Sequence, residues 1–253
     1  MRFVSKEHEV SIDEEIDNVS MKRPHVVILG AGASRATCLF GDKNKRKLPL
    51  MNDLVDAVGL RSRLEDWNID PNQNFENIFS DLYGKNEHQK INAIEHSVEN
   101  YFNSLELPDK PTVYDHLVLS LRKKDLIATF NWDPLLLQAY VRNRQAGLEL
   151  PELAFLHGNV KAGYCEQDKV SGLVGDKCIK CGSFYQKSPL LYPIKKKDYS
   201  KNSFIRGGWN FLKHCIKYTY MITIFGYSGP KTDAEAIEIM KDAWGNERLM
   251  IEM

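Results

Sequence analysis

The sequence has no long apolar run, no excess of charge and few cysteines, and each absence excludes a class of protein. No apolar stretch approaches the roughly 18 residues of a membrane-spanning helix, so we expect no membrane span. The 34 basic side chains balance the 34 acidic ones, so net charge gives no reason to expect a nucleic-acid partner. Residues 1–22 hold an acidic cluster and no signal-type apolar core, which predicts a flexible N-terminal arm rather than a secretory signal.

The five cysteines and the missing signal favour a reducing, cytoplasmic compartment, where paired cysteines indicate metal binding or catalysis rather than disulfides. Cys178 and Cys181 are separated by two residues and followed by a glycine, as in a zinc knuckle. Cys165 is a third candidate ligand. A structural zinc site needs four ligands, so either Asp168 supplies the fourth or the site is incomplete.

Strand-like and helix-like apolar segments alternate, which is typical of a parallel sheet with helices on both faces. Strands are expected at 25–29, 125–130, 153–156, 220–225 and 249–251, and later helices at 133–144, 209–218 and 232–244. From about 41 to 110 the spacing is helical throughout, which predicts an all-helical insertion after the first strand. Residues 160–187 are polar and rich in Cys and Gly, and predict a small separate module. We therefore expect a Rossmann-like α/β domain over 23–253.

The segment 25–36, HVVILGAGASRA, combines a buried strand, a glycine turn and a helix that should start at about Ala33. Such a helix N-terminus binds phosphate through backbone N–H groups and the helix dipole. We expect the turn to bind a cofactor pyrophosphate, with Gly30 and Gly32 allowing its close approach. Alone, the pattern also fits a buried strand followed by a plain glycine turn. The candidate cofactor-binding residues here are Gly30, Ala31, Gly32, Ala33 and Ser34.

Small or polar residues follow each of the expected strands. Because ligands bind at the carboxyl ends of parallel strands, these residues should meet at one edge of the sheet. They are Gly30–Ser34, Thr129–Asp133, His157–Asn159, Gly226–Ser228 and Glu252.

This order of motifs resembles the sirtuin superfamily. Sirtuins carry a GAGxS turn, a TQNID-like strand end, a histidine followed by glycine, a small zinc ribbon and a late G-x-S turn. The matching positions are Gly30–Ser34, Thr129–Asp133, His157–Gly158, Cys178–Cys181 and Gly226–Ser228. The phrases NFENIFSDL, TFNWDPLL and FGYSGPKTD are similar to the bacterial SIR2-like branch often found in phage defence.

The resemblance implies an enzyme that uses NAD, with a structural zinc ion as a possible second group. The implied function is NAD hydrolysis to nicotinamide and ADP-ribose by an antiphage effector. We expect NAD, a regulatory protein or domain and further copies of the chain as partners. Two segments depart from the deacetylase sirtuins: 37–50 lacks their G-x-P-D-F-R loop, and 191–197 replaces their F-G-E segment, which binds acyl-lysine peptides. Both departures disfavour peptide deacylation.

The residue types suit cleavage of the nicotinamide–ribose bond. Asn131 offers a donor and an acceptor for a ribose hydroxyl and a water molecule, and His157 can accept a proton near neutral pH. These two are the candidate catalytic residues. Thr129, Asp133, Gly226, Ser228 and Glu252 complete the expected cofactor site. Asp133 is also a suitable N-cap for a helix with Pro134 in its first turn. Asp233 fits either an N-cap or a ligand contact, and capping is favoured.

Three other functions stay open: an NAD-dependent protein deacylase, a non-catalytic module that senses NAD or ADP-ribose, and a Rossmann oxidoreductase. The oxidoreductase is disfavoured because Arg35 holds the position of the third fingerprint glycine. It also lacks a second strand that ends in an acidic residue about 20 residues further on, since Asp53 falls in a helical pattern.

Overall fold

The computed structural model describes residues 23–145, 147–194, 197–244 and 250–252, and its centre is a five-stranded parallel sheet. The strands are β1 (His25–Leu29), β2 (Leu126–Thr129), β3 (Glu152–Phe155), β7 (Met221–Phe225) and β8 (Met250–Glu252). Their order is β3-β2-β1-β7-β8, and each neighbouring pair is parallel. The predicted arm 1–22 lies outside the described residues.

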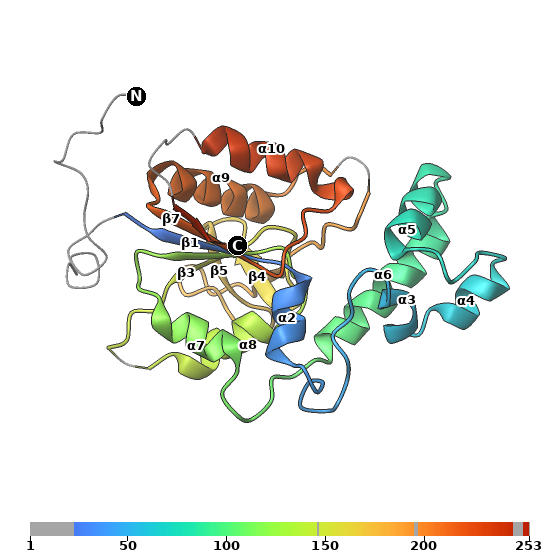
Figure 1. The fold of residues 1–253 in the computed structure, drawn as a ribbon, viewed down its shortest axis with the longest axis horizontal. Helices are drawn as coiled ribbons and strands as arrows, with labels where there is room; N and C mark the ends of the chain where they lie inside the picture. The colour runs from blue at the N-terminus through green and yellow to red at the C-terminus, as the bar shows by residue number, and fades with distance from the viewer. Residues whose placement is uncertain (1–22, 146, 195–196, 245–249, 253) are drawn as a thin grey trace.

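Helices cover both faces of this sheet, which confirms the predicted fold class. α9 (Ser203–Tyr218) and α10 (Ala234–Ala243) lie on one face, and α2 (Ala31–Thr37), α7 (Val113–Ser120) and α8 (Leu135–Asn143) lie on the other (Figure 1). Alternate residues of a strand point to opposite faces. Accordingly Val26 and Ile28 belong to the core under α9 and α10, whereas Val27 and Leu29 belong to the core under α7 and α8.

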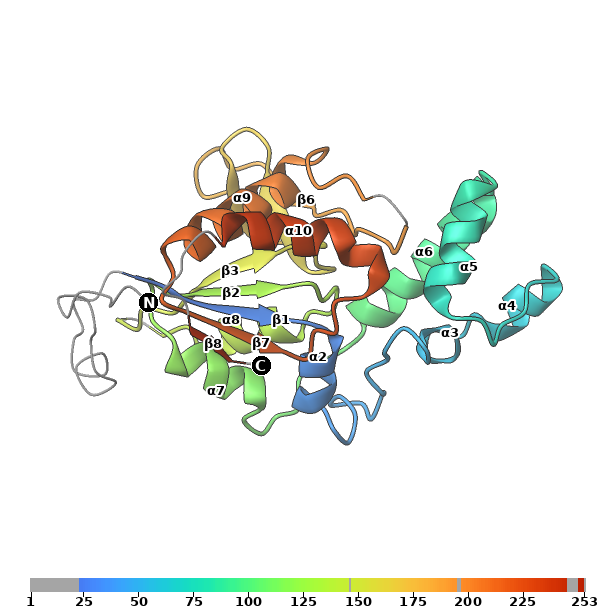
Figure 2. The ribbon, with the colours of Figure 1, turned by 45° about the horizontal axis from the view of Figure 1, so that its top comes forward.

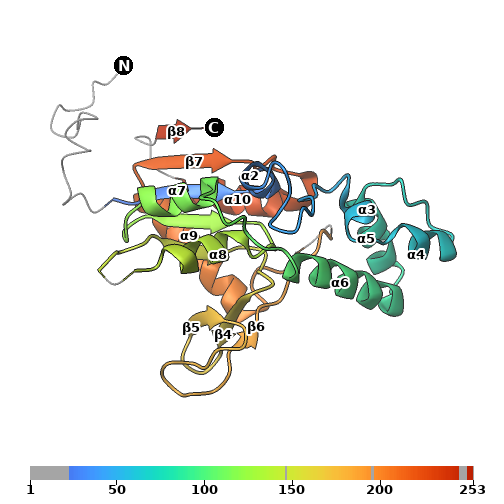
Figure 3. The same cartoon turned by 90° about the horizontal axis from the view of Figure 1, so that it is seen from below.

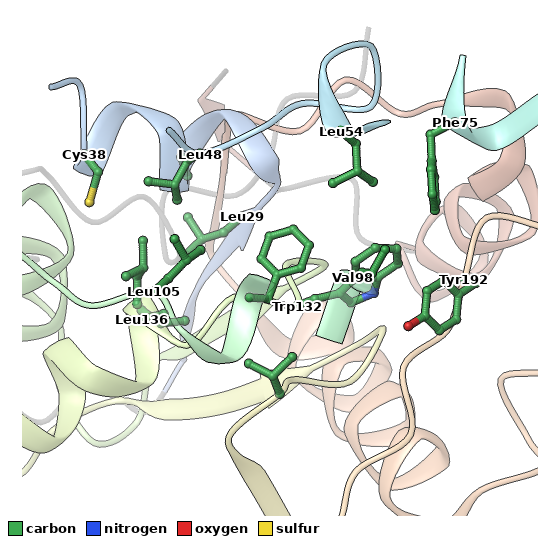
Figure 4. Packing of buried hydrophobic residues seen from close by; sticks show 14 of the residues in the cluster. Leu29, Cys38, Leu48, Leu54, Phe75, Val98, Leu105, Trp132, Leu136 and Tyr192 are labelled. Atoms are coloured by element: carbon green, nitrogen blue, oxygen red, sulfur yellow. The ribbon is translucent and has the colours of Figure 1, made fainter. Parts of the chain in front are cut away.

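The predicted helical insertion is present between α2 and α7. It contains α3 (Leu54–Ala57), α4 (Arg61–Asp66), α5 (Phe75–Gly84) and α6 (His88–Asn103), and it projects from the carboxyl end of β1 (Figure 2). Aromatic rings join it to the rest of the protein (Figure 4). Trp132 packs edge-on against Phe102 with ring centroids 5.9 Å apart, and Tyr192 stacks on Phe79 at 4.8 Å. The insertion therefore shares one continuous core with the sheet.

A small antiparallel sheet occupies the connection between β3 and α9. Its strands are β4 (Ala162–Cys165), β5 (Val170–Leu173) and β6 (Gln186–Lys187), in the order β5-β4-β6. Figure 3 shows it on the far side of the molecule from β7 and β8. This is the Cys-containing module that the sequence predicts. Within the described residues, no helix is both long and apolar enough to cross a membrane.

Several local expectations were wrong. α2 begins at Ala31 rather than Ala33. α8 begins at Leu135, so Pro134 takes the N-cap position that the sequence analysis gave to Asp133. Asp133 still provides an acceptor for a free N–H group at the start of the helix, because its Oδ1 accepts a hydrogen bond from the Leu135 N–H at 3.1 Å. Glu252 is the last residue of β8 rather than the residue after it.

Candidate functional site

A cavity of about 430 Å³ opens at the carboxyl ends of the strands. That volume falls within the roughly 300–1,000 Å³ typical of small-molecule sites. The chain runs from β1 to β2 and β3 on one side and returns to β7 on the other, so β1 and β7 flank the topological switch point, where ligands bind in open α/β sheets. The predicted residues that line the cavity are Gly30, Ala31, Gly32, Ser34, Asn131, Asp133, His157, Gly226 and Ser228.

Two predicted cofactor-binding residues do not line the cavity. Ala33 is fully buried and Thr129 is 1% exposed. Thr129 contributes indirectly, because its Oγ1 accepts a hydrogen bond from the Asn131 N–H at 3.0 Å and so holds the chain after β2. For Glu252 the structure describes the backbone strand alone, so its predicted contact with a ribose stays a prediction.

The two glycine turns pack directly on each other. The N–H groups of Gly30 and Gly32 donate to the carbonyl oxygens of Phe225 and Gly226, at 3.1 and 2.9 Å. A Cβ at Gly30 would lie 2.5 Å from the Gly226 oxygen. The structure gives these glycines a reason that the sequence did not, because they allow one turn to approach the other. Two of the N–H groups expected to face a phosphate are hydrogen-bonded inside the protein.

Gly226 should be the least replaceable of these glycines. Its φ is +67°, and an added Cβ would lie 2.1 Å from the Ala33 nitrogen. We expect Gly226→Ala to lower the free energy of unfolding by about 3 kcal/mol or more, because backbone strain and a clash add together. Gly207→Ala is the matched control, since Gly207 lies in α9 with nothing within 4 Å of an added Cβ. Urea denaturation should show the control unchanged or more stable; equal losses would contradict the packing argument.

Asn131 is held by a buried network of polar side chains. Its Nδ2 donates to the Gly30 carbonyl at 2.8 Å and to Ser34 Oγ at 2.9 Å. Ser34 Oγ in turn donates to Asp133 Oδ2 at 2.6 Å and lies 2.8 Å from the Tyr114 hydroxyl. Among the described residues, none donates to Oδ1 of Asn131. The amide is thus fixed through its nitrogen, and its oxygen is available to a ligand in the cavity.

Asp133 and Ser34 are structural in this network. Burial raises the pKa of the Asp133 carboxyl, and the hydrogen bonds from Ser34 and the Leu135 N–H oppose that rise. Both residues are at most 5% exposed. They line the cavity, but their polar atoms are hydrogen-bonded within the network. Their main effect is to hold the Gly30 turn against Asn131.

His157 is buried beside the cavity with an unpartnered nitrogen. Its side chain is 8% exposed, and Nε2 has no hydrogen-bond partner among the described residues. The ring packs edge-on against Phe130 at 4.8 Å and stacks near Tyr199 at 6.0 Å. Burial lowers the pKa of His157 to about 3, the Asp233 carboxylate raises it and the Lys197 ammonium lowers it. The resting imidazole is therefore neutral. The sequence analysis expected its pKa near neutral pH, and burial places it well below that.

Sequence reasoning missed Lys197 and misread Asp233, which form a buried ion pair on the cavity wall. Lys197 Nζ lies 2.5 Å from Asp233 Oδ1, and the two side chains are 3% and 5% exposed. Asp233 lies at the N-cap position of α10, but its side chain makes no capping hydrogen bond. The capping interpretation was therefore wrong. Lys197 ends a run of three lysines, and its sequence carries no signal that separates it from the others.

The cysteine module brings together the three predicted metal ligands and one acidic residue. Ligand atoms of Cys165, Asp168, Cys178 and Cys181 all lie within 4.8 Å of one another. The sulfur atoms of Cys165 and Cys181 are 3.6 Å apart, close to the separation of about 3.8 Å that tetrahedral zinc with 2.3 Å Zn–S bonds imposes. The donor set fits structural zinc, which would tie β4 to the turn at 178–181.

Metal analysis tests this group directly. We expect the purified protein to carry about one zinc per chain, and Cys178→Ser to lose most of it because three ligands hold the ion far less tightly. Cys215→Ser is the control, since Cys215 is also buried but lies in α9, outside the cluster. Zinc absent from the unmodified protein, or retained by Cys178→Ser, would contradict the assignment.

The fold and the cavity define an α/β protein with a ligand site at a topological switch point. No family model and no curated protein matches the sequence. Among solved structures the chain is similar to a sirtuin studied for substrate affinity, with 16% identity and a TM-score of 0.45 over 96% of this chain and 87% of that one.

Two further solved structures are similar at the same level. One is a mutant Sir2 homologue in complex with ADP-ribose (16% identity, TM-score 0.45, 90% of this chain and 78% of that one). The other is Sir2 with an inhibitor, 2′-O-acetyl-ADP-ribose and a deacetylated peptide (16%, 0.43, 95% and 85%). At TM-scores below 0.5 these likenesses do not assign the chain to a family. The function proposed below therefore rests on the cavity and its residues.

Proposed function

We propose that this protein is an NAD⁺ glycohydrolase, which cleaves the nicotinamide–ribose bond to release nicotinamide and ADP-ribose. One observation carries the proposal: Asn131 and His157 line the same cavity as the two glycine turns. A dinucleotide bound at the switch point would place its pyrophosphate near those turns. Ala31, the first residue of α2, lines the cavity, and an N–H at this helix position has no acceptor within its helix.

The chemistry needs little beyond orientation and one proton acceptor. The bond leaves through an oxocarbenium-like state, in which positive charge develops on the ribose as neutral nicotinamide departs. Water then adds to the ribose carbon, and its proton must be removed. Asn131 Oδ1 would orient the water or a ribose hydroxyl, and His157 Nε2 would accept the proton. NAD⁺ and water thus become ADP-ribose, nicotinamide and one proton.

The resting charge of His157 meets the first requirement of this role. A general base must be unprotonated before the reaction, and burial keeps the imidazole neutral. Its Nε2 has no hydrogen bond among the described residues to lose when it takes the proton. Trp132 Nε1, a second buried donor without a described partner, belongs to a cavity-lining residue and could meet a carbonyl or hydroxyl of the substrate.

Product analysis after incubation with NAD tests the proposal against its alternatives. We expect nicotinamide and ADP-ribose to form in equal amounts without any peptide present. Release that requires an acylated peptide would favour the deacylase. Binding of NAD or ADP-ribose without turnover would favour a sensing module, and reduction at the nicotinamide ring would favour an oxidoreductase.

We also propose that the protein acts as an antiphage effector that depletes cellular NAD. Support comes from the phrases at 74–82, 129–136 and 225–233, which resemble the bacterial SIR2-like branch. Cells that express the protein should lose NAD on phage infection and restrict the phage, whereas cells that express His157→Ala should do neither. Unchanged NAD during infection would contradict this role.

A further inference from the structure

Each member of the buried Lys197–Asp233 pair has a further hydrogen-bond partner. Lys197 Nζ also donates to the Thr232 carbonyl at 2.9 Å, and Asp233 Oδ2 accepts from the Tyr227 hydroxyl at 3.1 Å. Burying two charges is costly unless each is paired and hydrogen-bonded. Both conditions hold here, so the pair has a fixed geometry at the cavity wall.

The same carboxylate faces the candidate base. Asp233 Oδ1, the oxygen that binds Lys197, lies 3.6 Å from His157 Nε2. That separation is too long for a hydrogen bond to a neutral imidazole but short enough for strong attraction to an imidazolium. The ring of His157 is meanwhile held between Phe130 and Tyr199. Any proton that arrives on Nε2 therefore arrives beside a carboxylate whose charge a lysine partly offsets.

We infer that Asp233 is a positioning residue for His157 in the proposed NAD cleavage, and that Lys197 limits how strongly His157 holds the transferred proton. This inference rests on the proposed function. At rest burial keeps the imidazole neutral, and the lysine offsets part of the opposing effect of the carboxylate. When Nε2 takes the proton from water, the O–H bond breaks, an N–H bond forms, and Asp233 stabilises the imidazolium. Loss of that proton to solvent restores the starting state.

The groups that face His157 are few enough for this coupling to be measured. Asp233 and Lys197 are the charged groups that act on its pKa. Tyr199 and Tyr227 are the titratable neighbours, and burial raises the pKa of both, so they stay neutral in the working range. The ionisation of His157 should therefore respond to the lysine and the aspartate in opposite directions.

Lys197→Met is the sharpest test, because it removes the opposing charge and keeps an unbranched side chain. The pKa of His157 should rise by roughly one unit or more, since a lone carboxylate then faces the ring. NMR titration of ¹⁵N-histidine, with the His157 signal identified by its absence in His157→Gln, should show this shift. The acid limb of kcat/KM for NAD cleavage should move to higher pH by the same amount.

Asp233→Asn should act in the opposite sense and lower kcat about tenfold with little change in KM, because the imidazolium loses its counter-charge. This variant leaves Lys197 buried without a carboxylate, so its folding is at risk. The double variant Asp233→Asn/Lys197→Met removes both opposing charges, so the pKa of His157 should lie between those of the two single variants. Lys187→Met is the matched control, because it breaks the more exposed Lys187–Glu99 pair outside the cavity lining.

The two readouts separate the two ideas. If the unmodified protein cleaves NAD but Lys197→Met and Lys187→Met give the same His157 titration and the same pH profile, the coupling is wrong. A pKa of His157 that is as high in the double variant as in Lys197→Met would equally overturn the role of Asp233. If the unmodified protein does not cleave NAD while the His157 signal still shifts in Lys197→Met, the proposed function fails although the electrostatic coupling is real.

Discussion

Replacement of His157 by alanine is expected to lower kcat for nicotinamide release by about 10²- to 10⁴-fold, the usual contribution of a general base. Binding of ADP-ribose should change little, because Nε2 makes no hydrogen bond among the described residues and the proposed role of the ring is to accept a proton. Steady-state kinetics and calorimetry with ADP-ribose measure the two effects separately. His214→Ala is the control, since His214 is exposed on α9. A His157→Ala variant that works at the normal rate would remove His157 from the mechanism.

The pH dependence of activity distinguishes the buried His157 from a histidine with an ordinary pKa. A general base works in its unprotonated form, so activity is lost as the pH falls through its pKa. With the pKa of His157 lowered to about 3, activity should not fall through this group between pH 8 and 5. A histidine near its ordinary pKa of about 6.5 would lose most activity over that range. A sharp loss near pH 6.5 that follows His157 would contradict the buried, neutral state.

The sheet edge could be predicted because it follows from local patterns and one topological rule. Short β-branched runs identify the strands, and parallel strands put their carboxyl ends together. That rule is enough to bring Gly30, Asn131, His157 and Gly226 to one cavity, although they are far apart in the sequence. The helical insertion follows equally from its apolar spacing. What the patterns cannot supply is which polar atoms are already used inside the protein.

The rest of the site depends on the paths of long connections, which leave no periodic signal. Lys197 lies in the connection between the small sheet and α9, where nothing in the sequence shows that its ammonium is buried. Asp233 follows a glycine turn and precedes a helix, so local rules favour capping; the buried lysine overrides them. The glycine turns show the same limit. Their sequence indicates close approach, but only the fold shows that the approaching group is the other turn.

Asn131→Ala is expected to lower kcat about 10²-fold, the size of effect that small misplacement of reacting groups can cause. The variant removes the amide oxygen that faces the cavity and frees the Gly30 carbonyl and Ser34 Oγ, which Nδ2 binds. Two explanations would then compete: loss of a direct contact with substrate, or loss of the buried network. A variant of a residue that contacts Asn131 but does not line the cavity distinguishes the two explanations.

Tyr114→Phe is that partner variant. Tyr114 is fully buried, does not line the cavity, and its hydroxyl lies 2.8 Å from Ser34 Oγ and 3.3 Å from Asn131 Nδ2. Removing the hydroxyl should cost about 1–2 kcal/mol of unfolding free energy, as expected for a buried hydrogen bond. Ser34 and Gly30 still hold the amide, so kcat should stay within about threefold, a barrier change under 1 kcal/mol. If Tyr114→Phe instead lost as much activity as Asn131→Ala, Asn131 would act by holding the glycine turn in place rather than by touching NAD.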